Sequence, residues 1–235
     1  MENLNKTANN AQEQKLKITN LRKAIVASCK LLSQKQLMAG SWGNVSAKAA
    51  STTYAITPSG HGYDDLLDED IVIINAQGAV LAGNLLPSSE AKLHLAIYQK
   101  FPQAGAIVHT HSIYASVLAV LHKTLPPIIE DAVQVIGGSI CCAAYALPGT
   151  KELAHNVLIA LEDNKHAAFL ANHGLICWGR DLKEAVLTAE LTEKAAKIYC
   201  TAQTLGSVQE LKAEDVKTMH DFYLQHYSKR QRGEE

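Results

Sequence analysis

Two histidines separated by a single residue, His109 and His111, are the feature of the sequence most suited to chemistry. They end an apolar run over residues 106–108 that favours a buried β-strand. Side chains two residues apart on a strand point to the same side, so both imidazoles can bind one ligand. The periodic apolar residues after Ser112 favour a helix just beyond. The pair is therefore expected where a buried strand ends, a usual position for chemistry in α/β folds.

A third histidine, His173, lies in another apolar segment, residues 169–176. Three neutral imidazoles leave one coordination position open, which is the arrangement of a catalytic Zn²⁺ site. The sequence has 10 histidines in 235 residues, so chance spacing and hydrogen-bonded core histidines remain an alternative explanation of the pair alone.

Three short stretches combine glycine, hydroxyl or amide groups in a way that can hold an anion. They are residues 40–46, residues 57–62 and residues 87–89. Each stretch also has a purely structural explanation, as a turn or as the start of a helix. Glu90 follows the last of them and would bring a carboxylate to the same position.

The composition is that of a globular protein with a large core, at 47% hydrophobic residues and a net charge of −1. This balance suggests neither a nucleic-acid nor a membrane partner. The five cysteines are odd in number and lack CxxC spacing, which favours buried free thiols in a reducing compartment. We therefore expect a cytoplasmic protein.

The order of predicted elements indicates one mixed α and β domain over residues 19–230. Residues 1–18 are polar and are expected to form a flexible arm or the frayed start of a helix. Helices are predicted from Leu21 to about Met38, after Thr150, after Asp181 and over residues 214–227. Residues 71–82 are predicted to form a β-hairpin, and residues 126–135 an extended segment.

Taken together and in order, these motifs resemble the class II aldolase/adducin-head family over about residues 20–205. The stretches that carry the resemblance are Gly43-Asn44-Val45-Ser46, Thr57-Pro58-Ser59-Gly60, Pro87-Ser88-Ser89-Glu90, His109-Thr110-His111 and Asn172-His173-Gly174-Leu175. The resemblance implies an α/β fold, a three-layer α/β/α sandwich with a mainly antiparallel central sheet. It also implies a homotetramer with active sites between neighbouring subunits.

The implied activity is that of a metal-dependent lyase, which cleaves a ketose phosphate by retro-aldol chemistry to dihydroxyacetone phosphate and an aldehyde. By this resemblance, Zn²⁺ or another divalent metal would be bound by His109, His111, His173 and Glu90, and Glu90 would also act as the acid and base. The phosphate of the sugar phosphate would be bound by Gly43, Asn44, Ser59, Gly60, Ser88 and Ser89.

The chain departs from the family aldolases at two positions. A tyrosine that donates a proton to the neighbouring subunit's site is replaced here by Asp131, so either Asp131 takes over that role or the reaction differs. Trp42 stands where those aldolases carry a small residue, and Tyr223 or Tyr227 could supply their C-terminal tyrosine. The alternatives are a 4-epimerase, a phosphotetronate decarboxylase, a methylthioribulose-phosphate dehydratase or a non-catalytic adducin-like scaffold.

Overall fold

The computed structural model describes residues 2–162 and 165–233, and in them the chain forms an eight-stranded sheet with the order β4-β3-β2-β1-β5-β8-β7-β6. Neighbouring strands are antiparallel except for β6 and β7. The strands are β1 Asn44–Ala50, β2 Thr53–Ile56, β3 Val72–Asn75, β4 Val80–Ala82, β5 Ala106–Thr110, β6 Cys142–Ala143, β7 Ala167–Leu170 and β8 Gly174–Gly179. The predicted hairpin over residues 71–82 is thus confirmed as β3 and β4.

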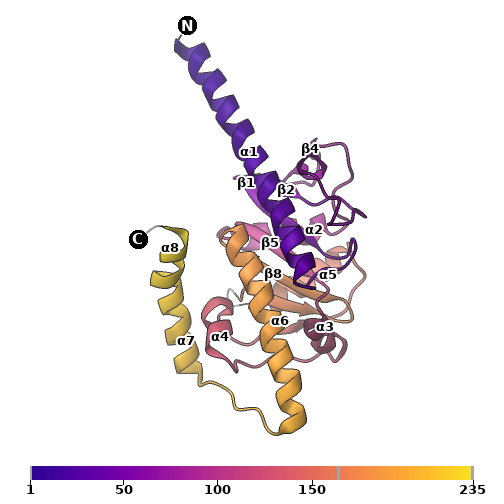
Figure 1. Cartoon of the computed structure of the whole chain (residues 1–235), viewed down its shortest axis with the longest axis vertical. Coiled ribbons are helices and arrows are strands. Elements are labelled where there is room, and N and C mark those ends of the chain that lie inside the picture. Colours follow the sequence, from indigo (N-terminus) through magenta and orange to yellow (C-terminus); the bar gives the residue numbers. More distant parts are fainter. Residues whose placement is uncertain (1, 163–164, 234–235) are drawn as a thin grey trace.

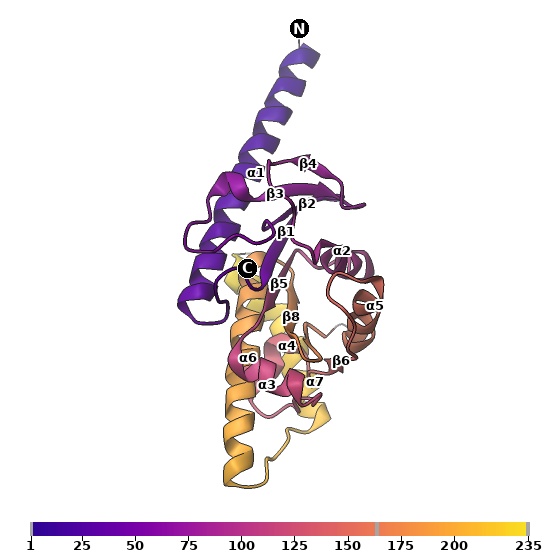
Figure 2. The same cartoon turned by 90° about the vertical axis from the view of Figure 1, so that its right-hand side faces the viewer.

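Helices cover both faces of the sheet (Figures 1 and 2). They are α1 Glu2–Gln34, α2 Ala91–Lys100, α3 Ile113–Val120, α4 Glu130–Ile136, α5 Lys151–Ala160, α6 Leu182–Leu205, α7 Ala213–Phe222 and α8 Ser228–Arg232, with a π-helical turn at Tyr223–Tyr227. Helices α2 and α5 lie on one face, and α1 and α6 lie on the other. The expected three-layer α/β/α sandwich with a mainly antiparallel sheet is confirmed.

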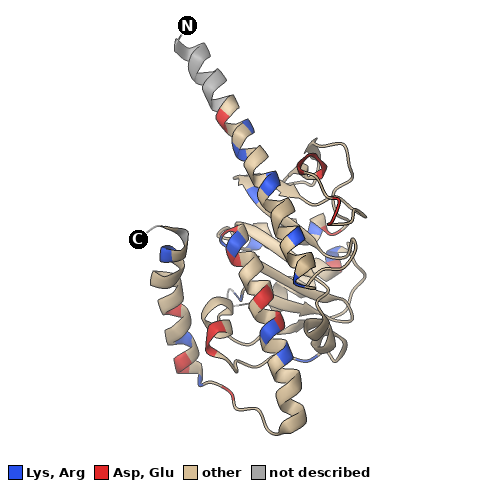
Figure 3. Ribbon diagram, in the orientation of Figure 1, with Lys and Arg blue, Asp and Glu red and all other residues tan. Residues whose placement is uncertain are grey.

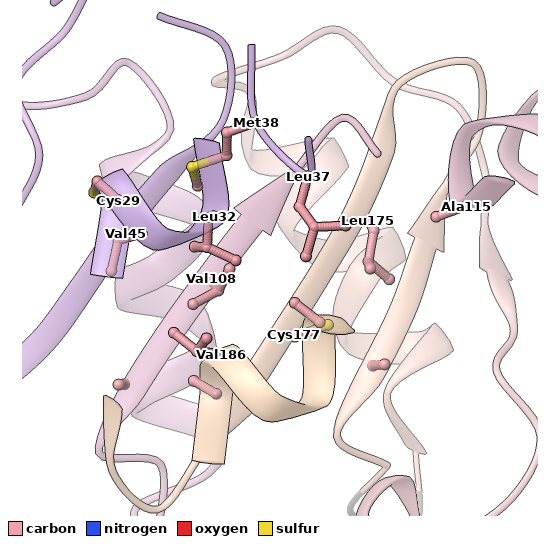
Figure 4. Packing of buried hydrophobic residues seen from close by; sticks show 14 of the residues in the cluster. Cys29, Leu32, Leu37, Met38, Val45, Val108, Ala115, Leu175, Cys177 and Val186 are labelled. Atoms are coloured by element: carbon pink, nitrogen blue, oxygen red, sulfur yellow. The ribbon is translucent and has the colours of Figure 1, made fainter. Parts of the chain in front are cut away.

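Successive side chains of the central strands point to opposite faces of the sheet, so the hydrophobic core forms two layers, one on each face. On β5, Val108 packs towards α1 and α6, whereas Ile107 packs towards α2 and α5. Figure 4 shows the first of these layers, in which Leu32 of α1 and Val186 of α6 meet Val108. Every residue of β5 is buried, so the strand that leads to the histidine pair is anchored on both sides.

Two predicted segments differ from the structure. The polar segment over residues 2–18 is part of α1, which begins at Glu2 and projects beyond the sheet in both views. The extended segment predicted over residues 126–135 is wrong at its end, because residues 130–136 form α4. There, Asp131 and Glu130 favour the start of a helix, buried Val133 and Ile136 pack on one face, and Gly137 ends it at φ +91°.

Acidic and basic side chains are interspersed along α6 and α7 (Figure 3). In the described residues, no helix combines the length and apolar character needed to cross a membrane.

A buried histidine in the core, His166, makes the stability of the fold depend on pH. His166 is 3% exposed, and its ring lies 4.0 Å from that of Trp178 between centroids. Burial lowers the pKa of His166 to about 4, against a smaller opposing effect of Glu184. An unfolded histidine has a pKa of about 6.5, so acid protonates the unfolded chain first. This stabilisation is complete above about pH 6.5 and is lost as the pH falls towards the folded pKa.

We expect His166 to account for about 2 kcal/mol of the decrease in unfolding free energy between pH 7 and pH 5. Urea unfolding at both pH values, with wild-type and His166→Asn proteins, measures this contribution. The variant should lose about 2 kcal/mol less than the wild type over this interval. Equal losses in the two proteins would show that His166 does not contribute.

Candidate active site

The three predicted histidines converge at the end of strand β5. His109 lies on β5, His111 follows its last residue, and His173 lies in the turn between β7 and β8. One ligand atom from each ring lies within 4.8 Å of the others. The Nε2 atoms of His109 and His111 are 2.9 Å apart. The expectation that the pair would share one side of the strand is thus fulfilled in the structure.

Close packing of β8 against β5 brings His173 to this pair. Thr110 pairs with Leu175 across the two strands. At Gly174, a Cβ atom would lie 2.4 Å from the carbonyl oxygen of Thr110, so a larger residue would push the strands apart. Within the turn, Asn172 adopts φ +55°, a backbone conformation that asparagine tolerates better than most residues. Gly174 therefore allows the close contact between strands, and Asn172 allows the tight turn, that together hold His173 beside His109.

Hydrogen bonding orients the ring of His109. Its Nδ1 donates to the backbone carbonyl of Leu175 at 2.8 Å, which leaves the lone pair on Nε2 and directs it towards His111. A metal-binding histidine commonly donates its other ring nitrogen in this way.

The environment keeps two of the rings neutral. Burial, together with the neighbouring histidines, lowers the pKa of His111 to about 3 and that of His173 to about 4. Neutral imidazoles are the form that binds metal ions. Opposed nitrogen lone pairs need a cation or a proton between them, so the geometry and the electrostatics both suit a metal ion.

Glu90 adds a carboxylate to the three histidines. It is 5% exposed at the start of α2, and its side chain does not cap the helix. Its Oε2 lies 3.1 Å from Nε2 of His109, and its Oε1 lies 3.7 Å from Nε2 of His173. The Oε1 atom is buried without a hydrogen-bond partner. A buried carboxylate oxygen facing imidazole nitrogens is suited to bind a metal ion or to exchange a proton.

The charge of Glu90 is maintained despite its burial. Burial alone would raise its pKa, but His109, His173 and a hydrogen bond from Asn44 together lower it. The Nδ2 of Asn44 donates to Oε2 of Glu90 at 2.9 Å. Glu90 is therefore a carboxylate at neutral pH in a fixed orientation.

The candidate phosphate loops lie next to one another and to this carboxylate. The backbone N–H of Ser59 donates to Leu86 at 2.9 Å, and that of Ser88 donates to Thr57 at 3.0 Å. The Ser88 hydroxyl accepts from the backbone N–H of Glu90 at 3.3 Å. Asn44 connects the first loop to Glu90, as described above. Ser59, Gly60 and Ser89 are exposed, so their polar groups are accessible.

Gly43 fixes the first loop against the site. It adopts φ +95°, and a Cβ atom there would lie 2.6 Å from the backbone oxygen of His109. The hydroxyl of Tyr63 donates to the backbone oxygen of Gly43. Only glycine fits this position without moving β5.

The structure does not bring Asp131 or Tyr223 to the histidines of the same chain. Asp131 lies in the first turn of α4 and forms an ion pair with Lys194 of α6. The buried hydroxyl of Tyr223 donates to Glu184 at 3.0 Å, so its hydrogen is already engaged within this chain. Tyr227 is 49% exposed.

A buried polar network behind Glu90 was not predicted from the sequence. Nδ1 of His94 lies 2.7 Å from the hydroxyl of Ser46, which lies 2.9 Å from that of Tyr98. Burial lowers the pKa of His94 to about 3, so the ring is neutral. Glu90, His94 and Tyr98 are spaced four residues apart, and this polar face of α2 is the signal that could have revealed the network.

The chain belongs to the class II aldolase and adducin family. Residues 23–200 match the family described as Class II Aldolase and Adducin N-terminal domain. Among particular proteins, the chain is 36% identical over 199 residues to the 5-deoxy-D-ribulose 1-phosphate aldolase of Bacillus thuringiensis, with 84% of this chain and 92% of the relative covered.

The chain is also 36% identical over 181 residues to the L-fuculose phosphate aldolase of Escherichia coli, with 77% of this chain and 83% of the relative covered. A solved structure titled L-fuculose 1-phosphate aldolase matches with a TM-score of 0.83 at 36% identity. That match covers 87% of this chain and 96% of the solved one. The family expected from the sequence is therefore confirmed.

Proposed function

We propose that this protein is a zinc-dependent aldehyde-lyase that cleaves a ketose 1-phosphate into dihydroxyacetone phosphate and an aldehyde. The observation that carries the proposal is the convergence of His109, His111 and His173 on one point beside the ionised Glu90. Three imidazole nitrogens and an exchangeable carboxylate fit the ligand set of a catalytic Zn²⁺ site. The aldolase relatives support the choice of reaction.

Glu90 would transfer the protons of the reaction. In retro-aldol cleavage, the ionised Glu90 would take up the proton of the C4 hydroxyl, C4 would become the aldehyde carbonyl, and the electron pair of the broken C3–C4 bond would pass to C3. A divalent cation would supply Lewis-acid stabilisation of the negative charge that develops on the ketose oxygens. Carbon C3 then needs a proton, and Glu90 would deliver it and recover it in the reverse direction. Asn44 holds the carboxylate in place for this exchange.

The phosphate would lie against the neighbouring loops that carry Asn44, Ser59 and Ser88. Gly43, Gly60 and Ser89 complete the proposed phosphate-binding set. Backbone N–H groups and hydroxyls can bind a dianion without a lysine cluster. These loops lie beside Glu90, and this supports binding of the phosphate next to the reacting carbons.

We also propose that the enzyme is a homotetramer in which Asp131 reaches the neighbouring subunit's site and takes part in the proton transfer there. Asp131 lies outside the histidine cluster of its own chain and its side chain is partly exposed, which supports a role across an interface. An exposed apolar stripe on α3, just after the histidine pair, supports a contact between subunits there. Its residues are Ile113, Val117, Val120 and Leu121. A cytoplasmic location is part of the proposal and is supported by five unpaired cysteines.

A product assay tests the reaction. The Zn²⁺-loaded protein is incubated with several ketose 1-phosphates, and dihydroxyacetone phosphate and the aldehyde are quantified. Equal amounts of the two products should form, at a rate that falls to background after chelation. An epimerised, decarboxylated or dehydrated product would replace this proposal with one of the related reactions. If none of the substrates is consumed, the non-catalytic adducin-like scaffold would be favoured instead.

A further inference from the structure

His94 is a buried histidine one helical turn beyond Glu90, and one of its ring nitrogens has no partner. The residue is 1% exposed, and its backbone N–H donates to the backbone oxygen of Glu90 at 3.3 Å. Residues four apart on a helix share a face, so the two side chains lie on the same side of α2. Nδ1 of His94 contacts the hydroxyl of Ser46, but Nε2 is buried without a hydrogen-bond partner. Such an atom is rare in a folded protein.

The hydrogens of the network decide which ring nitrogen of His94 carries the proton. The hydroxyl of Ser46 has a single hydrogen and lies 2.7 Å from Nδ1 of His94 and 2.9 Å from the hydroxyl of Tyr98. If Ser46 donated to Tyr98, the hydrogen of Tyr98 would have no acceptor in the part of the chain that the structure describes, and Nε2 would still have no partner. If Tyr98 donates to Ser46 and Ser46 donates to Nδ1, only Nε2 is left over. This second arrangement satisfies more buried groups, so the hydrogen of the ring is on Nε2.

The surroundings hold this Nε2 hydrogen in place. Rotation of the ring would break its hydrogen bond with Ser46, which lies on strand β1. The ring of Tyr98 stacks on that of Tyr54 of β2, with 4.5 Å between centroids, and so fixes the far end of the network. Burial lowers the pKa of His94 to about 3, and the charge of Glu90 partly opposes this effect. The carboxylate therefore lies within electrostatic reach of a neutral, fixed hydrogen-bond donor.

The carboxylate of Glu90 is directed elsewhere in this structure. Its Oε2 accepts from Asn44 and lies 3.1 Å from Nε2 of His109, and its Oε1 has no hydrogen-bond partner. A charged acceptor and a neutral donor thus lie one helical turn apart on the same face of α2, and neither Oε1 nor Nε2 of His94 is satisfied. Rotation of the Glu90 side chain alone, without movement of the helix, can bring the two groups together.

We propose that His94 is a positioning residue that receives the carboxylate of Glu90 when a bound ketose phosphate takes its place among the three histidines. This inference rests on the proposed aldolase function and assigns it a further residue. The Nε2 hydrogen of His94 would donate to the carboxylate and hold it beside the reacting carbons while it exchanges protons with them. Hydrogen bonds to a charged group are stronger than those between neutral groups, so this contact would stabilise the complex with substrate or product. His94 itself neither gains nor loses a proton.

Two substitutions that differ in the donor that they keep test this role. His94→Asn retains a polar group near Nδ1 for Ser46 but has none near Nε2, whereas His94→Gln can place an amide N–H near Nε2. Calorimetry measures the binding of dihydroxyacetone phosphate to the Zn²⁺-loaded proteins. His94→Asn should weaken this binding about tenfold or more, and His94→Gln should restore part of the loss. The kcat/KM for ketose phosphate cleavage should fall in parallel.

The affinity for Zn²⁺ separates this role from a merely structural one. Measured without dihydroxyacetone phosphate, it should match wild type in both variants, because Nε2 of His94 has no partner in that state. If His94 only supported the packing of α2, its replacement would disturb Glu90 in both states and would weaken the binding of Zn²⁺ as well.

Crystal structures of the Zn²⁺-loaded wild type test the same role without a substitution in the core. With dihydroxyacetone phosphate bound, one carboxylate oxygen of Glu90 should lie about 2.7–2.9 Å from Nε2 of His94. Without it, the two atoms should lie beyond hydrogen-bond distance. A carboxylate that turns to any other partner in the complex, or that stays among the histidines, would overturn the role of His94.

The possible failures are distinct. If wild type neither binds dihydroxyacetone phosphate nor cleaves a ketose phosphate, the aldolase proposal fails and this inference fails with it. If wild type does both, and His94→Asn weakens the binding of Zn²⁺ and of dihydroxyacetone phosphate equally or changes neither, only the role of His94 is overturned.

Discussion

Glu90→Gln should lower kcat for ketose phosphate cleavage by about 10²–10⁴-fold, the usual contribution of a general acid or base. Glutamine has nearly the same shape and can still accept the hydrogen bond from Asn44. It cannot take up and return a proton. The effect should therefore fall on kcat far more than on KM, because the groups proposed to bind the phosphate are unchanged.

The control for this substitution is Glu152→Gln, which removes an exposed carboxylate from the first turn of α5. It should retain wild-type kcat and KM. Bound metal is measured in both variants, because Glu90 is also a proposed ligand. A Glu90→Gln protein with wild-type kcat would remove Glu90 from the mechanism. A loss of activity that tracks loss of metal would restrict Glu90 to a ligand role.

Replacement of a histidine ligand should have the largest effect of all. His173→Ala should lower bound Zn²⁺ from about one ion per chain to less than about a tenth, and activity should fall to background with it. Removal of one of the three histidine ligands weakens the site by more than the 10–100-fold that outer-shell changes cause. Metal content by plasma mass spectrometry and a Zn²⁺ titration of the apoprotein measure this effect.

The matched control is His155→Ala, since His155 is an exposed histidine on α5 outside the cluster. It should keep both its metal and its activity. Chelation of wild type should abolish activity, and addition of Zn²⁺ should restore it. Full metal content in His173→Ala, or full activity in chelated wild type, would contradict the assignment of the site.

Local rules predict much of this site from the sequence. The two-residue periodicity of a strand placed His109 and His111 together, and helix capping located two helix starts. Thr150 accepts from the N–H of Leu153, and Asp181 accepts from that of Glu184, as their positions before the helices indicate. That His173 joins the pair was a hypothesis from residue type, which the family resemblance strengthened, because spacing alone does not show which strands are neighbours.

The parts that the sequence did not predict depend on tertiary contacts. Residues 130–136 are rich in Val and Ile, which favour a strand, yet packing against α6 and α7 and the stop at Gly137 select a helix. The network of Ser46, His94 and Tyr98 was missed because apolar periodicity takes account only of Leu93, Ile97 and similar positions on α2. The polar face of α2 can be recognised as a buried network only when it is known that strand β1 packs against it.

The most direct test of the account is a crystal structure of the Zn²⁺-loaded protein, with anomalous diffraction recorded on both sides of the zinc absorption edge. We predict one strong anomalous peak per chain, about 2.0–2.1 Å from a ring nitrogen of each of His109, His111 and His173. A peak elsewhere, or three rings that face apart with no zinc among them, would contradict the central claim.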